Sequence, residues 1–344
     1  MNKLTYKAFP TLKSTPYFLT LSLAVTLASC STKPPEPSNP WLDTPAHFLE
    51  ITHPVDNELT LERWELGRRL FFETKLSLDG SKSCASCHFP QTSFATNFPT
   101  NKGVGGAEGV RNSPSLANIG YHPHFTREGG VPTLEMQVLV PIQEENEFHN
   151  NILDIADTLN NYPSYVEASL EAYGTVVTPF VITRAISCFE RTFISGNSPY
   201  DRYIAGDSTA LTSSEIAGLE VFEAKGCTAC HSGIFQSNFS IENNGLYEVF
   251  SDAGLFNLTG DEGDRGKFKV PSLRNVALTH PYMHDGSLMN LNEVIDHYVS
   301  GGSSNPNKSH LITPFELSDT ERNDLKSFLE ALTDQEFVNW ASGL

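Results

Sequence analysis

The sequence is short of positive charge. It contains 23 Lys and Arg residues against 41 Asp and Glu residues, which gives a formal net charge of −18 at pH 7. Such an acidic chain is unsuited to nucleic acid, because phosphate groups attract basic surfaces. The charge would suit a basic soluble cytochrome as a docking partner, since opposite charges steer encounter, and it would equally serve only to keep the protein soluble.

A long hydrophobic run is also missing. The apolar stretch at residues 17–28 (YFLTLSLAVTLA) is too short for a membrane-spanning helix, which needs about 20 such residues. It follows the basic residues Lys3, Lys7 and Lys13, and this order is typical of a secretory signal. We therefore predict that residues 1–29 are a signal peptide for export rather than part of the fold.

The signal ends in Leu27-Ala28-Ser29-Cys30, which resembles the lipobox of bacterial lipoproteins. Cleavage before Cys30 would leave a lipid-modified thiol that anchors the protein to a membrane surface. The Pro- and Ser-rich residues 30–48 would then be a tether, and Ser31 resembles the outer-membrane variant of such signals. We expect an exported protein, lipid-anchored to the outer membrane and facing the periplasm. The alternative is an ordinary signal peptide whose last residue is Cys.

Strand-like alternation of apolar and polar residues is missing over more than a few positions. Apolar residues recur instead at helical spacing in residues 59–73, 179–194 and 211–223. The third segment opens with the Thr-x-x-Glu spacing of a capping box, and Ser318 and Glu321 have a similar spacing that predicts the start of a last helix. We therefore predict a mainly α fold.

Cysteines are few, but four of the six stand in two copies of one motif. The pentapeptide Cys-x-x-Cys-His occurs at residues 84–88 and 227–231, and it is typical of covalent attachment of a c-type haem. A zinc site, a disulfide or a redox dithiol would use similar cysteine pairs. The two pairs lie far apart in the sequence, however, each is followed directly by His, and no βαβ pattern surrounds them. The predicted haem-binding residues are Cys84, Cys87 and His88 for the first haem, and Cys227, Cys230 and His231 for the second.

Each haem motif follows a helical segment, so the chain has the pattern of a degenerate tandem repeat. Segment 59–73 precedes the first motif and segment 211–223 precedes the second. We predict two cytochrome c-like haem domains, an N-terminal one over residues 49–200 and a C-terminal one over residues 201–344. Cys188 lies among apolar residues at helical spacing, and we expect it to be a core residue.

The chain resembles the bacterial dihaem cytochrome c peroxidase family, including its MauG-type branch, over nearly everything after residue 50. The resemblance rests on the two haem motifs and on four further blocks in the family's order and spacing. These blocks are RNSPSLAN (111–118), PTLEMQVLVPIQEENEF (132–148), FERTFISGNSPYDRY (189–203) and VPSLRNVALTHPYMHDG (270–286). The resemblance implies an N-terminal haem that meets hydrogen peroxide, and a C-terminal haem that receives electrons from a donor such as a small c-type cytochrome.

Glu147 and Gln137 match the family's distal glutamate and distal glutamine. The resemblance implies that they assist O–O cleavage on the open side of the first haem, opposite His88. Cleavage needs a group that moves a proton between the two oxygens, and a carboxyl in a partly apolar pocket has a raised pKa that suits this task. From the residues alone, Glu147 is one of three neighbouring acids with Glu144 and Glu145, and a solvated loop would be the simpler interpretation.

Two departures from the family concern the haem ligands. Typical members carry a removable distal His after the first haem motif, but residues 89–120 contain no His, which predicts a first haem that accepts peroxide without prior reduction. Typical members supply a Met ligand to the second haem, and Tyr298 stands at that position, as in MauG-type enzymes. A Tyr ligand would lower the haem's reduction potential. Helical spacing alone would make Tyr298 a core residue, and Met283, Met289 and His297 are competing ligands.

A third departure lies between the haems. Family members usually place Trp in the motif before the distal Gln as an electron bridge, and by spacing that position is Arg127 here. The family also holds a calcium ion between its domains through one side-chain amide and two backbone carbonyls, and Asn112, Thr279 and Pro281 match those positions. Oxygen ligands suit calcium, so we expect one calcium ion. The alternative is that these residues only order the interface.

The resemblance implies a haem-dependent oxidoreductase that reduces hydrogen peroxide to water with electrons from a small redox donor. One alternative is a MauG-like oxidase that modifies residues of a partner protein, which Tyr298 favours and Arg127 disfavours. Another is a non-catalytic dihaem electron carrier, in which both irons would be six-coordinate. Family members are often dimers, and the resemblance therefore allows a homodimer.

Overall fold

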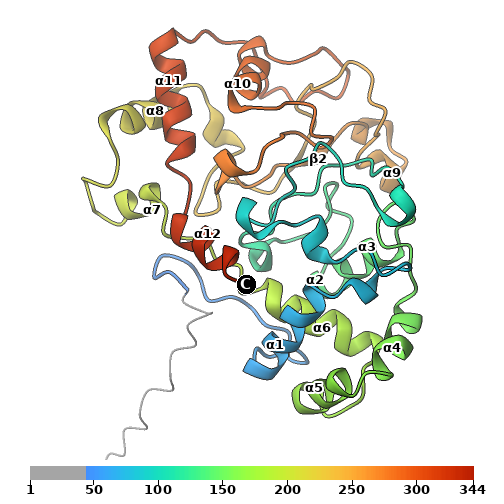
Figure 1. Ribbon diagram of the computed structural model, residues 1–344. Helices are drawn as coiled ribbons and strands as arrows, with labels where there is room; N and C mark the ends of the chain where they lie inside the picture. The colour runs from blue at the N-terminus through green and yellow to red at the C-terminus, as the bar shows by residue number, and fades with distance from the viewer. Residues whose placement is uncertain (1–43) are drawn as a thin grey trace, which may run out of the picture. The chain divides into compact units, whose positions relative to one another are not determined.

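The computed structural model describes residues 44–344 (Figure 1), so the predicted signal peptide and Cys30 lie outside the described residues. The described part is mainly helical, which confirms the predicted fold class. Its helices are α1 (Leu61–Phe71), α2 (Leu134–Gln137), α3 (Leu139–Gln143), α4 (Ile152–Asn160), α5 (Pro163–Tyr173), α6 (Pro179–Glu190), α7 (Pro199–Ile204), α8 (Ser213–Ala224), α9 (Phe256–Thr259), α10 (Leu291–Ser300), α11 (Asp319–Glu330) and α12 (Gln335–Ser342). Two short strands, β1 (Ile241–Glu242) and β2 (Phe268–Lys269), pair in antiparallel fashion. Across residues 44–344, every helix is too short or too polar to cross a bilayer.

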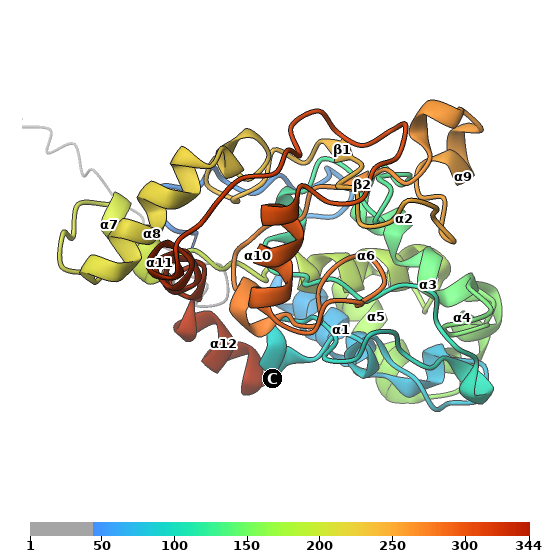
Figure 2. The same cartoon turned by 90° about the horizontal axis from the view of Figure 1, so that it is seen from above.

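The two halves of the chain repeat one helix crossing. In the N-terminal half α1 packs against α6, and in the C-terminal half α8 packs against α11 (Figures 1 and 2). Gly67 stands at the first crossing, where a Cβ would lie 1.9 Å from the backbone oxygen of Ala185. Gly218 stands at the second, where a Cβ would lie 1.9 Å from the backbone oxygen of Asp324. Glycine therefore permits the close approach of the helices in both halves.

A second repeated feature is a buried asparagine with a left-handed backbone. Asn118 has φ of 58° and Asn275 has φ of 60°, a conformation that Asn tolerates better than most residues. The N–H of Asn118 donates to the carbonyl of Phe193 at 2.6 Å, and that of Asn275 donates to the carbonyl of Leu332 at 3.0 Å. Each asparagine thus ties the loop after a haem motif to the chain that follows α6 or α11.

Each half has its own hydrophobic core. The first lies around α1 and α6, where the rings of Phe94 and Phe193 stack with centroids 3.9 Å apart. The second lies around α8, α10 and α11, where Phe222 meets Phe328 at 5.2 Å. Cys188 is 0% exposed, so its expected place in the interior is confirmed. Burial raises the pKa of this thiol to about 11.

The C-terminal helix α12 departs from the expectation that the helix after Ser318 is the last one. Ser318 does cap α11 and accepts from the N–H of Glu321 at 3.2 Å. Asp334 then caps a further short helix by accepting from the N–H of Phe337 at 3.0 Å. Phe337 and Val338 pack in the first core. The helix predicted after Ser318 therefore forms as α11, but it is not the last helix, because the chain returns as α12 to cover the N-terminal half.

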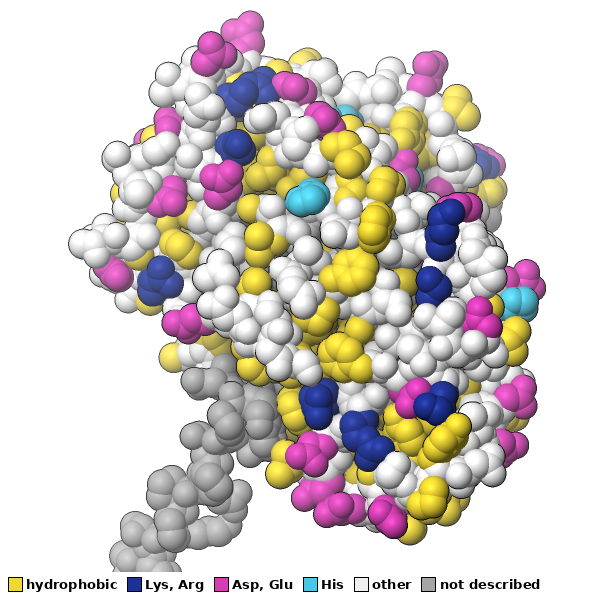
Figure 3. All heavy atoms as spheres, in the orientation of Figure 1, with side chains coloured by type: hydrophobic (Ala, Val, Ile, Leu, Met, Phe, Trp, Pro, Cys, Tyr) yellow, Lys and Arg dark blue, Asp and Glu magenta, His cyan; other side chains and the backbone are white. Residues whose placement is uncertain are grey.

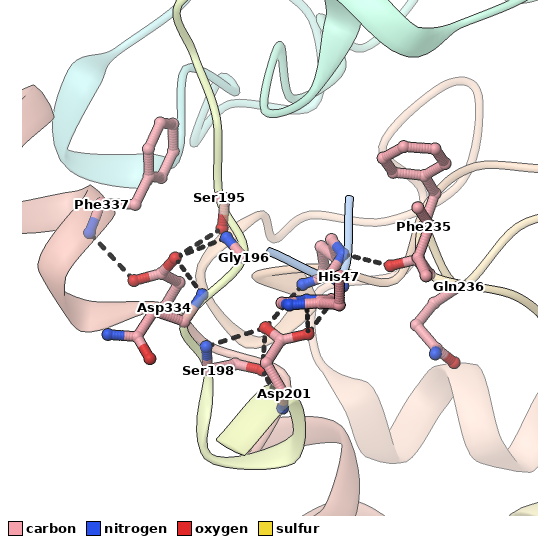
Figure 4. Close-up of polar contacts among 12 residues, drawn as sticks. His47, Ser195, Gly196, Ser198, Asp201, Phe235, Gln236, Asp334 and Phe337 are labelled. Atoms are coloured by element: carbon pink, nitrogen blue, oxygen red, sulfur yellow. Dashed lines mark hydrogen bonds and ion pairs between the residues drawn. The ribbon is translucent and has the colours of Figure 1, made fainter. Parts of the chain in front are cut away.

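The segment between the two halves, residues 195–201, is held by buried carboxylates (Figure 4). Asp334 accepts from the backbone N–H of Gly196 at 2.8 Å. The two carboxylate oxygens of Asp201 accept hydrogen bonds from the two terminal nitrogens of the Arg274 guanidinium at 2.8 Å each. Both side chains are 2% exposed. Removing one partner of such a pair would leave an uncompensated buried charge. These contacts therefore fix the connection between the halves.

The described end of the predicted tether packs on the protein. Phe48 is 7% exposed, and its ring meets Tyr121 and Phe235 edge-on. His47 Nε2 lies 3.3 Å from Asp201 Oδ1 (Figure 4). By residue 47 the chain is therefore in contact with the segment that connects the two halves.

Candidate haem-binding sites

Both Cys-x-x-Cys-His motifs fold into the same local structure. Cys84–Ser86 and Cys227–Ala229 each form one turn of 3₁₀ helix. In each motif the N–H of the histidine donates to the carbonyl of the first cysteine at 2.9 Å. The cysteines of residues 44–344 form no disulfide. Two thiols and an imidazole thus come from one tight turn, as attachment to a single porphyrin requires.

Both motif histidines are held through Nδ1. His88 Nδ1 lies 2.8 Å from the carbonyl of Phe94 and 3.1 Å from that of Pro114. His231 Nδ1 lies 3.2 Å from the carbonyl of Gln236. A carbonyl can only accept, so Nδ1 carries the proton and Nε2 keeps its lone pair. This is the arrangement that an iron-ligating imidazole needs.

The surroundings also keep these imidazoles neutral. Burial lowers the pKa of His88, and it lowers that of His231 to about 4. Neutral imidazole is the form that binds metals. The residues present therefore fit a c-type haem at each motif.

Gln137, the last residue of α2, has a polar atom without a partner. Its Oε1 is buried and accepts no hydrogen bond from residues 44–344. A buried amide oxygen in this state costs free energy. A ligand that donates a hydrogen bond at this point would remove the cost, which fits the distal position predicted for Gln137.

Glu147 lies in the turn between α3 and α4. The N–H of Val104 donates to its carbonyl at 2.9 Å, and its own N–H donates to the carbonyl of Glu144 at 3.0 Å. The surrounding protein, and then repulsion from Glu144, raises the pKa of the Glu147 carboxyl to about 7, although the residue itself is solvent-exposed. Burial and the Glu147 charge together raise the pKa of the Cys87 thiol to about 11. Glu147 therefore lies within electrostatic range of the first haem motif.

Tyr298 lies on α10 beside the second haem motif. Burial raises the pKa of its phenol, a hydrogen bond with the Asn244 side chain opposes this, and the thiols Cys230 and Cys227 raise the pKa further. Those electrostatic contacts place the phenol near both attachment thiols. The structure thus brings together Tyr298 and the motif whose iron it is predicted to bind.

Of the competing ligands, one is hydrogen-bonded to another group and one is exposed to solvent. His297 Nε2 donates to the backbone carbonyl of Asn244 at 3.1 Å, and Met289 is 51% exposed. Met283 Sδ accepts from the Asn244 amide at 3.3 Å, so it shares a neighbour with Tyr298. Tyr298 and Met283 are therefore the two candidates that the structure leaves at the second haem.

Asn112, a predicted calcium ligand, is hydrogen-bonded to Arg127. The guanidinium donates to Asn112 Oδ1 at 2.7 Å and to the backbone oxygen of Asn112 at 2.7 and 3.1 Å. Burial lowers the pKa of Arg127 to about 10, so it stays charged at neutral pH. Thr279 and Pro281, the other predicted ligands, precede α10 in the C-terminal half. The contact between Arg127 and Asn112 was not predicted from the sequence.

Comparison with known proteins decides the family. Residues 61–209 match the family model described as di-haem cytochrome c peroxidase, and residues 216–333 match that for cytochrome c. The methylamine utilization protein MauG of Methylorubrum extorquens is 36% identical over 287 residues, which span 82% of this chain and 81% of MauG. This chain belongs to the di-haem cytochrome c peroxidase family.

Further relatives carry both names that occur in this family. Cytochrome-c peroxidase IdrP1 of Pseudomonas sp. strain SCT is 33% identical over 356 residues, covering 92% of each chain. The crystal structure of a MauG-like protein associated with microbial copper homeostasis superposes with a TM-score of 0.82 at 33% identity, covering 86% of this chain and 96% of that one. Membership of the di-haem peroxidase family implies c-type haems and haem-dependent oxidoreductase chemistry.

The di-haem peroxidase fold here contains polar contacts between its halves that the sequence analysis missed. Arg111 donates to both carboxylate oxygens of Asp252 at 2.6 and 3.1 Å, and within its own half it also pairs with Glu128. Lys269 Nζ donates to the carbonyl of His124 at 2.8 Å. These partners are far apart in the sequence, and no local pattern marks them. Only the folded chain shows that they meet.

Glu190, at the end of α6, is a further residue that sequence reasoning did not single out. It is 8% exposed, and burial raises its pKa to about 8. After burial itself, the Glu190 charge is the largest contribution to the raised pKa of the Cys84 thiol. A carboxyl that is mostly neutral at pH 7 therefore lies near the first haem motif.

Proposed function

We propose that this protein is a dihaem peroxidase that reduces hydrogen peroxide to water with electrons from a small redox donor such as a c-type cytochrome. One arrangement carries the proposal. An unpartnered Gln137 oxygen and a Glu147 carboxyl of near-neutral pKa accompany a haem motif whose His88 is held ready to bind iron. A non-catalytic electron carrier would have no need of this pair.

When bound, the two c-type haems would supply the electrons and the iron at which peroxide binds. Gln137 Oε1 would accept a hydrogen bond from peroxide and so orient it. The Glu147 carboxylate would take a proton from one peroxide oxygen and deliver it to the other, which then leaves as water. Complete reduction consumes two electrons and two protons for each peroxide and yields two water molecules.

The C-terminal half would receive the electrons. Cys227, Cys230 and His231 would hold the second haem, and the Tyr298 phenol would be a further ligand to its iron. A phenolate stabilises oxidised iron, so this haem would have a low potential. Cys84, Cys87 and His88 would hold the first haem, where residues 89–120 supply no histidine to block peroxide.

The test is to mix the as-isolated, fully oxidised protein with hydrogen peroxide and reduced cytochrome c, without first reducing the enzyme. Rapid oxidation of the cytochrome is the expected result, because no loop histidine has to be displaced. A fast change of the haem spectrum with negligible oxidation of the cytochrome would contradict the proposal.

That second outcome would favour a MauG-like oxidase that modifies residues of a partner protein. Tyr298 beside the second motif supports this candidate, as do relatives named MauG or MauG-like. Arg127 at the interhaem position speaks against it. A protein encoded beside this one, incubated with the enzyme and peroxide, would show an oxidative mass change only if this candidate is right.

We also propose that the protein is exported and lipid-anchored at the periplasmic face of the outer membrane. The order of basic residues, apolar stretch and Leu27-Ala28-Ser29-Cys30 supports this proposal. Changing Cys30→Ser should release the protein from the membrane fraction without loss of haem. A wild-type protein that is already found wholly in the soluble periplasmic fraction would contradict it.

A further inference from the structure

Asn112 stands at the joint between the two halves, where the family resemblance predicts a calcium ion. It is 4% exposed, and its N–H donates to the carbonyl of His284 at 2.8 Å. Calcium here would need Asn112 Oδ1 together with the carbonyl oxygens of Thr279 and Pro281, since this ion binds through oxygen. The site therefore depends on whether Oδ1 is available to a metal.

Asn112 Oδ1 already accepts a charged hydrogen bond. Arg127 Nη2 donates to it at 2.7 Å, and Nη2 and Nε also donate to the backbone oxygen of Asn112 at 2.7 and 3.1 Å. The amide cannot turn away without losing its other contact, because Nδ2 donates to the carbonyl of Phe98 at 3.0 Å. Hydrogen bonds from an ionised donor are the stronger kind. The oxygen is thus committed to a cation that belongs to the chain.

The charges around Arg127 disfavour a second cation. A second basic residue lies directly beside Arg127, because the backbone N–H of Lys269 donates to the Arg127 carbonyl at 2.7 Å. Two acids of the C-terminal half are hydrogen-bonded to other side chains, since Asp252 pairs with Arg111 and Asp285 accepts from the Tyr247 hydroxyl at 2.5 Å. In the described part of the chain no carboxylate forms an ion pair with Arg127. A divalent ion beside Asn112 would meet this charge without an acidic ligand of its own.

We propose that the Arg127 guanidinium takes the place of the family's calcium ion, so that this protein joins its two halves without a metal. The guanidinium would place its positive charge against Asn112 Oδ1, the amide oxygen that matches the family's calcium ligand. The carbonyls of Thr279 and Pro281 accept no backbone hydrogen bond within residues 44–344, but with Asn112 Oδ1 bound to Arg127 they would be the only two of the three predicted protein ligands left for calcium. This metal-free contact between the halves does not depend on whether the protein reduces peroxide.

The first test measures metal content and stability of the haem-loaded protein. We expect elemental analysis by mass spectrometry to find well below one calcium ion per protein chain. The thermal midpoint and the Soret spectrum should stay unchanged after treatment with EGTA and after addition of millimolar calcium. One firmly held calcium per chain, whose removal lowers the thermal midpoint, would overturn the proposal.

The second test changes Arg127→Gln, which removes the positive charge of the side chain. The measurement is made under the same calcium-free conditions as the first test. Its matched control is Arg265→Gln, an arginine paired at the surface with Glu262. We expect the haem-loaded R127Q protein to have a thermal midpoint several degrees below that of the control. Equal midpoints would show that the guanidinium does not hold the joint, and would overturn the proposal even if calcium were absent.

Discussion

At the scale of single residues, Glu147 is the group that we propose for the proton transfer. Changing Glu147→Gln keeps the size of the side chain but removes the group that titrates. We expect kcat/KM for hydrogen peroxide to fall by on the order of 10²–10⁴, the usual contribution of a positioned acid–base group. Steady-state oxidation of reduced cytochrome c measures this. The neighbouring exposed acid Glu145, changed to Gln, is the control, and full turnover by E147Q would refute the assignment.

The pKa of Glu147 also sets a pH dependence. Burial and repulsion from Glu144 raise this pKa to about 7, and the carboxylate that accepts a proton is the form present above it. Peroxide turnover, measured as kcat/KM, should therefore fall as the pH drops below about 7. Changing Glu144→Gln removes the repulsion, so the fall should move to lower pH. A profile that is flat across this range in the wild type would contradict the role.

Tyr298 sets the properties of the second haem in this scheme. If Tyr298 is the ligand as proposed, changing Tyr298→Met would replace a ligand that favours ferric iron with one that favours ferrous iron. We expect the reduction potential of the second haem to rise and its absorption spectrum to change, measured by spectroelectrochemical titration. Met289→Leu, at an exposed position, should leave both unchanged. A Y298M protein with the wild-type potential would show that Met283 or another group is the ligand.

At the scale of elements, the crossing of α8 and α11 depends on Gly218. A Cβ at this position would lie 1.9 Å from the backbone oxygen of Asp324, so Gly218→Ala must push the two helices apart. Overpacking of this kind costs about 1–3 kcal/mol, and we expect a lower thermal midpoint of the haem-loaded protein. Gly343→Ala is the control, because its Cβ would meet nothing closer than 3.4 Å. Equal midpoints for the two variants would contradict the close crossing.

The helices that carry the motifs were predictable because their signals are local. The spacing of apolar residues marked α1 and α8, and the capping box at Thr212 and Glu215 forms as predicted, with Thr212 Oγ1 accepting from the Glu215 N–H at 3.3 Å. The short helix α12 was missed because its apolar residues pack on the other half of the chain, a contact that no local pattern reveals. The left-handed Asn118 and Asn275 were missed for the same reason.

The candidate site residues also divide into those that a local sequence motif marks and those that it does not. Cys84, Cys87 and His88 are fixed by one pentapeptide, so their spacing alone points to a haem. Glu147 and Tyr298 came from the family resemblance, since a turn with three acids and a helical tyrosine are ordinary features by themselves. The hydrogen bond between Arg127 and Asn112 could not be predicted, because these residues are 15 positions apart in irregular chain and no periodic pattern brings them together.

At the scale of the whole molecule, the net charge of −18 would influence how an electron donor approaches. On the face drawn in Figure 3, acidic side chains lie mainly around the periphery and hydrophobic side chains run through the middle. Opposite charge raises association rates by about 10–10³, and raising the ionic strength from about 0.01 M to about 1 M shortens the Debye length from about 30 Å to about 3 Å. We expect kcat/KM for a basic cytochrome c to fall at least tenfold over this range, while kcat/KM for an acidic cytochrome rises. The KM for hydrogen peroxide, a neutral molecule, should stay constant. Equal salt dependence for the two cytochromes would mean that the charge serves solubility and does not steer the donor.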